Sequence, residues 1–65
     1  MKSVRKHTIH DRLSIDIALA NSAKNKEDKK ALAYQALGAV EIAVEFDLIT
    51  YMEFESYINS IFSIL

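Results

Sequence analysis

The chain has 65 residues, a formal net charge of −1 at pH 7 and no cysteine, which allows a single domain and excludes both a disulfide framework and a thiolate metal site. Hydrophobic residues make up 51% of the sequence, with one glycine and no proline, so the composition is too apolar for a disordered chain and typical of a packed helical protein. A chain this short buries only a modest share of its surface, and we therefore expect a second copy to add the stability that a disulfide or metal would otherwise supply.

The first helix is expected over residues 9–23, after a flexible basic arm at residues 1–7. Thr8 and Asp11 have the T-x-x-D spacing of a helix cap. Apolar residues then recur at the intervals of one helix face, at Ile9, Leu13, Ile17 and Ala20. Residues 13–17 also alternate between apolar and polar side chains, so a short strand is the alternative for this segment.

A second helix is expected over residues 26–46, with Asn25 as its cap and with Glu27 and Asp28 in its first turn, where acids suit the helix dipole. The core-facing residues are expected to be Leu32, Ala36, Ala39, Val40, Ala43 and Phe46. Further apolar residues lie outside this stripe, so the helix must be covered on more than one side. Gly38 costs about 1 kcal/mol relative to alanine inside a helix, and we expect it to let another helix approach closely.

The turn between the second helix and a third one carries a specific pattern of capping residues. Thr50 and Glu53 have the spacing of a capping box, and Ile49 and Phe54 occupy the two positions of a hydrophobic staple. Asp47 falls where a helix commonly ends in a left-handed residue. So short a connection predicts that the second and third helices form an antiparallel hairpin.

The third helix is expected over residues 51–64, and it carries more apolar surface than a small monomer can cover. Aromatic and methionine side chains are expected in the core or in an interface: Tyr34, Phe46, Tyr51, Met52, Phe54, Tyr57 and Phe62. Self-association is expected through one stripe of the third helix, formed by Phe54, Ile58, Ile61, Phe62 and Leu65. Burying one such side chain against a second copy adds roughly 1.5–3 kcal/mol. The sequence therefore predicts an all-α, three-helix domain packed in a homodimer; the alternative is a monomeric three-helix bundle.

Charge is unevenly distributed along the sequence. Eight basic and four acidic residues give residues 1–30 a formal charge of +4, whereas five acidic residues and no basic ones give residues 31–65 a charge of −5. The five acids lie around the predicted turn, at Glu41, Glu45, Asp47, Glu53 and Glu55. We predict that this acidic cluster contacts a basic partner protein. The alternative is an acidic face in contact with water that keeps the protein soluble.

The sequence carries no strong signature of chemistry. His7 and His10 are three residues apart, but no further histidine completes a metal site, and the single glycine excludes a glycine-rich phosphate loop. The scattered serines and threonines lack a base and an orienting residue. We therefore expect no enzyme activity, no cofactor and no metal.

Nucleic-acid binding is the second functional hypothesis. Lys2, Arg5, Lys6 and Arg12 could contact phosphates, although the chain is not basic overall and has no aromatic residue among them to stack on a base. Neither a signal-peptide core nor a membrane-spanning stretch is recognisable, so a cytoplasmic location is expected. The favoured prediction is a small, non-enzymatic regulatory protein that acts by helix-mediated contact with another protein.

Overall fold

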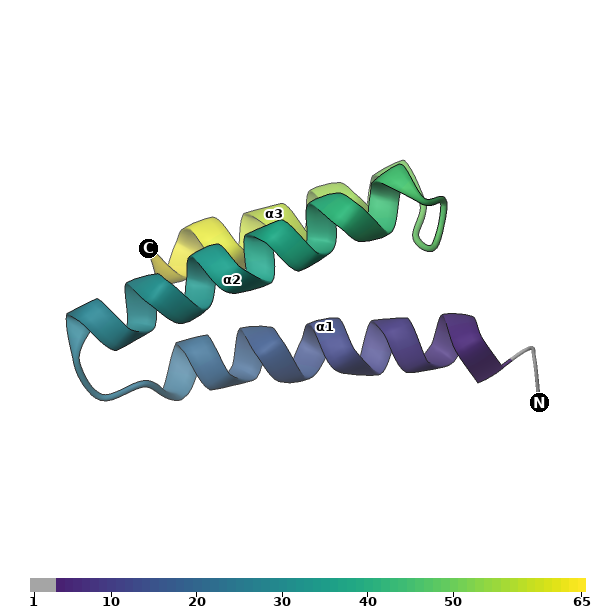
Figure 1. Cartoon of the computed structure of the whole chain (residues 1–65). Helices are drawn as coiled ribbons and strands as arrows, with labels where there is room; N and C mark the ends of the chain where they lie inside the picture. The colour runs from purple at the N-terminus through teal and green to yellow at the C-terminus, as the bar shows by residue number, and fades with distance from the viewer. Residues whose placement is uncertain (1–3) are drawn as a thin grey trace.

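The computed structural model describes residues 4–65, with side chains described from residue 8 onward. The described residues form three helices and no strand: α1 (Val4–Ser22), α2 (Lys26–Glu45) and α3 (Tyr51–Ile64). Figure 1 shows α1 along one side of α2, with α3 running back alongside α2 after the turn. The helices pack compactly into a body of 38 × 22 × 14 Å. The all-helical, three-helix prediction is confirmed.

The start of α1 differs from the prediction. The helix begins at Val4, inside the segment 1–7 that we expected to be a flexible arm, and residues 1–3 of that segment lie outside the described residues. Thr8 is therefore inside the helix and does not cap its start. No glycine or proline precedes Thr8 to stop the helix, and arginine and lysine are good helix formers. Residues 13–17 are helical, so the strand alternative is wrong.

The start of α2 follows its local sequence. The side chain of Asn25 accepts a hydrogen bond from the backbone N–H of Asp28 at 2.8 Å, as predicted for a cap. The Asn25 amide also donates to the Asp28 carboxylate at 3.1 Å. Glu27 and Asp28 lie in the first turn, where their negative charges favour the helix.

The end of α2 is a Schellman motif with Asp47 in the left-handed conformation, at φ 61°. The N–H of Leu48 donates to the carbonyl of Ala43 at 2.8 Å, and the N–H of Asp47 donates to the carbonyl of Val44 at 3.1 Å. The predicted left-handed residue is confirmed. A residue with a Cβ atom is strained in the left-handed conformation, although aspartate is one of the residues that tolerate this conformation best.

The start of α3 is the predicted capping box. The N–H of Glu53 donates to the Thr50 hydroxyl at 3.1 Å, and the N–H of Thr50 donates to the Glu53 carboxylate at 2.7 Å. Ile49 is buried and Phe54 is half-buried against the same core, as expected for a staple. The turn therefore has both of its ends fixed by local hydrogen bonds.

The core is built largely from small side chains. Its buried residues come from all three helices and from the turn: Leu13, Ala20, Ala33, Ala36, Val40, Ala43, Ile49 and Ile61. On α2, Ala33 is buried in addition to three members of the predicted series, while Leu32 and Ala39 are half-buried. Phe46 was expected in the core and is 71% exposed. The buried stripe stops at Ala43 because α2 ends at Glu45, and Phe46 lies where the chain turns away.

Many large apolar side chains remain exposed in the described part of the chain. They are Ile15, Leu19, Tyr34, Ile42, Phe46, Tyr51, Met52, Phe62 and Leu65. Four buried alanines contribute little apolar area to the core, so this fold leaves more apolar surface outside than its core accounts for. Over residues 4–65, each helix is too short or too polar to span a bilayer.

Candidate functional site

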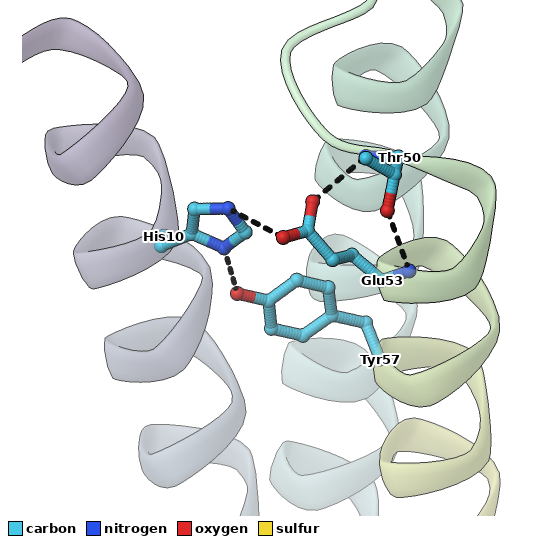
Figure 2. A network of polar contacts seen from close by, with 4 residues as sticks. All are labelled: His10, Thr50, Glu53 and Tyr57. Atoms are coloured by element: carbon cyan, nitrogen blue, oxygen red, sulfur yellow. Dashed lines mark hydrogen bonds and ion pairs between the residues drawn. The ribbon is translucent and has the colours of Figure 1, made fainter. Parts of the chain in front are cut away.

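A polar network joins α1 to the start of α3 (Figure 2). The imidazole of His10 lies between two side chains of α3, with its Nδ1 2.6 Å from the Tyr57 hydroxyl and its Nε2 3.5 Å from the Glu53 carboxylate. The other oxygen of Glu53 accepts from Thr50, so the capping box and the network share one carboxylate. The rings of His10 and Tyr57 also stack, with their centroids 5.8 Å apart.

In the neutral tautomer that carries its proton on Nε2, His10 faces Glu53 with an N–H group, and an ionised carboxylate only accepts. Nδ1 is then the acceptor, and the Tyr57 hydroxyl donates to it. His10 thus bridges a donor and an acceptor on the same helix, one turn apart, and this arrangement holds α1 in register with α3.

Burial raises the pKa of the Tyr57 phenol above its ordinary value of 10.0. A hydrogen bond with the Ser14 side chain lowers this pKa in part, while the nearby charges of Glu53 and Asp11 raise it further. Each carboxylate opposes the formation of a second negative charge beside it. The phenol therefore stays protonated and keeps its role as a hydrogen-bond donor through the neutral pH range.

The network contains the residues of an acid–base pair. The two hollows identified in the described structure are lined by other residues. Among the described side chains, those of residues 8–65, no group of three histidine, cysteine or acidic residues is close enough to hold a metal. The contacts of His10 with Tyr57 and Glu53 brace α1 against α3. Nothing local in the sequence pointed to it, because His10 and Tyr57 are 47 residues apart.

The predicted acidic cluster does not act as one unit. Glu53 is turned toward Thr50 and His10 and is half-buried. The other four members are exposed, and none of them forms an ion pair with another described residue: Glu41, Glu45, Asp47 and Glu55. The structure thus leaves four of the five carboxylates available to a partner.

Exposed apolar side chains accompany these acids at the turn between α2 and α3. Phe46 is 71% exposed, Tyr51 73% and Met52 82%. We call the set formed by these three and their acidic neighbours the turn surface: Glu45, Phe46, Asp47, Tyr51, Met52 and Glu55. An apolar patch bordered by charges of one sign is typical of a protein-binding surface. Phe46, Tyr51 and Met52 had been expected in the core or in an interface, and all three lie outside the core.

The predicted self-association stripe is divided by the fold. Ile61 is completely buried within the chain, so its assignment to a contact with a second copy is wrong. Phe54 and Ile58 are half-buried against the core. Phe62 is 55% exposed and Leu65 is 49% exposed, so these two remain able to contact another molecule. Ile61 and Phe62 are 100° apart on the helix, and α1 and α2 cover only the first of them.

The basic residues fall into two groups. Arg12 is exposed on α1, with its Nε 3.9 Å from the carboxylate of Asp16, and it lines a small hollow with Leu48 of the turn. The side chains of Lys2, Arg5 and Lys6 lie outside the described side chains, so those predicted nucleic-acid contacts have no described geometry. Because α1 runs against α2, Arg12 lies at the same end of the molecule as the turn surface.

Four lysines gather at the opposite end, around the loop between α1 and α2. Lys24, Lys26, Lys29 and Lys30 line a hollow of about 750 Å³ together with Tyr34, Ile64 and Leu65. We call it the lysine hollow. None of these lysines is ion-paired with another described residue. Tyr34 is one helical turn from Lys30 on α2, and the fold brings Ile64 and Leu65 to the other side of the same hollow.

The chain matches no protein-family model, no curated protein and no solved structure. Its functional interpretation therefore depends on its own residues.

Proposed function

We propose that this protein is a small, non-enzymatic regulatory protein that acts by helix-mediated protein–protein interaction and offers an acidic surface to a basic partner. The turn surface carries the proposal. It combines three of the most exposed large apolar side chains of the fold with three carboxylates that have no ion-pairing partner among the described residues. Exposed aromatic and methionine side chains provide affinity once they are covered, and the surrounding charges select a partner of opposite sign.

Asp47 gives separate support for a binding role. It occupies the left-handed region at φ 61°, where glycine would be unstrained. Local strain of this kind is frequent at sites with a function, since the fold tolerates it in order to place a particular side chain. Here the strained residue is a carboxylate at the tip of a turn, next to the exposed Phe46. An acid at this tip is well placed to meet a lysine or arginine of the partner.

The proposed mechanism is occupancy. By covering a basic surface of its partner, or by imitating an anionic molecule that normally binds there, the protein would block access without a chemical step. The proposal requires no cofactor and no metal. It also includes a cytoplasmic location and a homodimer in which α2 and α3 form an antiparallel hairpin, with most of the turn surface of each copy left open.

The test is affinity capture from a lysate of the source cells, treated with nuclease to remove nucleic-acid bridges. Wild type is compared with Phe46→Ser/Met52→Ser, which weakens the apolar part of the turn surface, and with Asp47→Asn/Glu55→Gln, which removes two of its charges. Ile15→Ser/Leu19→Ser on α1 is the matched control, because those side chains are 54% and 52% exposed.

We expect one protein to be retained by wild type and by the α1 control, and to be lost from the Phe46→Ser/Met52→Ser variant. Its retention should fall with added salt and with the charge variant. Equal retention by all four proteins, at equal helical content, would refute binding through the turn surface.

Nucleic-acid binding is the second candidate, and the lysine hollow favours it. Four lysines beside Tyr34 provide both phosphate contacts and a ring on which a base can stack. Four phosphate contacts predict a slope of log affinity against log salt of about −3 to −4. Fluorescence anisotropy with labelled single- and double-stranded DNA and RNA, starting near about 50 mM salt, tests this. Absence of binding at the lowest salt would remove the candidate.

A further inference from the structure

The outward face of α2 carries an unusual set of residues. Its members follow one another at intervals of one helical turn: Lys30, Tyr34, Gly38, Glu41 and Glu45. They lie opposite the buried stripe of the same helix, which is formed by Ala33, Ala36, Val40 and Ala43. Tyr34 is 52% exposed, and the three charged residues are exposed as well. We call these five residues the α2 outer face. It is continuous with the edge of α3, because Tyr34 and Leu65 line the same hollow.

Gly38 has no role inside the chain. A Cβ atom added at this position would meet nothing within 4 Å. Its φ is not positive, so the backbone does not require glycine either. Alanine would fit and would strengthen the helix, because glycine is the poorest helix former apart from proline. What glycine does provide at the middle of an exposed helix face is room for the backbone of another helix to come close.

The charges of the α2 outer face have no opposite partner within the described residues. Glu41 and Glu45 lie one turn apart and repel each other, and both lie near the helix C-terminus, where negative charge is unfavourable. Lys30 is at the other end of the same face, and neither it nor either glutamate forms an ion pair with another described residue. A basic group of another molecule, placed near Glu45, would offset both the repulsion between the two glutamates and the unfavourable negative charge at the helix C-terminus.

The spacing of these residues has a two-fold pattern. Lys30 and Glu45 are equally distant along the helix from the midpoint between Leu37 and Gly38, and so are Tyr34 and Glu41. If α2 of a second copy lies antiparallel across this midpoint, Lys30 of each copy faces Glu45 of the other copy. The dimer then contains two such pairs. Gly38 then sits at the crossing point, where the two helices come closest. A parallel copy would instead place like charges opposite each other.

We propose that the α2 outer face binds a second copy of this chain about a two-fold axis that passes between Leu37 and Gly38. This inference rests on the proposed homodimer and assigns its interface and register. A stable interface takes roughly 800 Å² from each partner, which is about a sixth of the 4886 Å² surface of the chain. The exposed Leu65, at the end of α3, provides apolar area next to the α2 outer face, because it lines the same hollow as Tyr34. The turn surface lies largely outside this contact.

The test uses two charge reversals, Lys30→Glu and Glu45→Lys, and measures the dissociation constant of the dimer by analytical ultracentrifugation. In the proposed register each single variant places like charges opposite each other at two points, so we expect its dissociation constant to rise roughly tenfold. An equimolar mixture of the two variants restores both attractive pairs in a heterodimer. We expect the dissociation constant of that heterodimer to lie within about threefold of the wild-type value.

Matched controls carry the same charge changes on α1, as Arg12→Glu and Asp11→Lys, and these should leave the dissociation constant within about threefold of wild type. Gly38→Ala should change the stability of the monomer and that of the dimer in opposite directions. It should raise the melting temperature of the diluted protein by about 4–8 °C, and it should weaken the dimer.

The outcomes separate the two proposals. A protein that is monomeric at every concentration overturns the homodimer and this interface with it. A dimer whose single variants associate like wild type, or whose mixture associates no better than either variant alone, overturns this interface and leaves the homodimer standing. A dimer that is weakened by both single variants and recovered in their mixture supports the proposed register.

Discussion

Replacing Glu53 by alanine removes the contacts of its carboxylate, and the sizes of two of them can be separated. One is the hydrogen bond from the Thr50 N–H at 2.7 Å, which closes the capping box. The other is the contact with His10 at 3.5 Å, between side chains that are 39% and 29% exposed. A capping interaction contributes about 1 kcal/mol, and a partly exposed contact between a carboxylate and an imidazole contributes about 0.5 kcal/mol. We therefore expect Glu53→Ala to lower the free energy of unfolding by about 1.5 kcal/mol.

Glu53→Gln distinguishes these two contributions. The amide oxygen of glutamine can still accept from Thr50, while the charge that faces His10 is lost. The expected loss is about 0.5 kcal/mol, and the same loss should disappear when His10 is already replaced by alanine. Urea denaturation followed by circular dichroism measures all of these variants under one set of conditions.

Two results would refute this reasoning. If Glu53→Gln destabilises the protein as much as Glu53→Ala does, the capping hydrogen bond is not the larger contribution. If the loss from Glu53→Gln is unchanged in the absence of His10, the cross-helix contact contributes nothing. Thr50→Ala is the control for the other half of the capping box, and it should cost about 1 kcal/mol on its own.

Three further changes should affect stability in predictable directions. Asp47→Gly relieves the left-handed strain at φ 61° and should raise the melting temperature by about 4–8 °C; a lower melting temperature in a thermal scan would contradict this. Ile61→Ala opens a cavity at a completely buried site and should lower the free energy of unfolding by about 2–5 kcal/mol. Phe62→Ala changes a side chain that is 55% exposed and should lower the free energy of unfolding of the diluted protein by less than about 1 kcal/mol. Equal losses of the two variants in urea denaturation would contradict the assigned burial. Because the pKa of Tyr57 is raised, the folded state keeps the phenol proton to higher pH than the unfolded state does. The free energy of unfolding should therefore be unaffected below about pH 10 and fall as the pH rises further. Tyr57→Phe should flatten that decline, and an unchanged decline would show that other groups cause it.

Local sequence predicted the parts of this fold that local interactions determine. The cap at Asn25, the capping box at Thr50 and the left-handed Asp47 each depend on neighbours within a few residues, and all three are confirmed. The start of α1 could not be placed in the same way, because no strong stop signal precedes Thr8 and the helix continues back to Val4.

The long-range features of the candidate site were beyond local patterns. Ile61 and Phe62 are equally apolar neighbours on a helix with a wide apolar face, and only the positions of α1 and α2 decide which one is buried. Glu53 was assigned to the acidic cluster by its charge, but its contact with His10 depends on how α1 crosses α3. Ile64 and Leu65 line the lysine hollow only because α3 ends beside the start of α2, which no local pattern shows.

We propose that the apolar side chains left exposed by the fold belong to interfaces with other molecules. The most direct measurement is the mass of the wild-type protein by light scattering, across a dilution series at low and high salt. We predict a mass twice that of the 7.4 kDa chain at the higher concentrations, retained in high salt because apolar contacts contribute most of the affinity. A mass of one chain at every concentration and at both salt levels would contradict the homodimer and leave the turn surface as the remaining proposed protein contact.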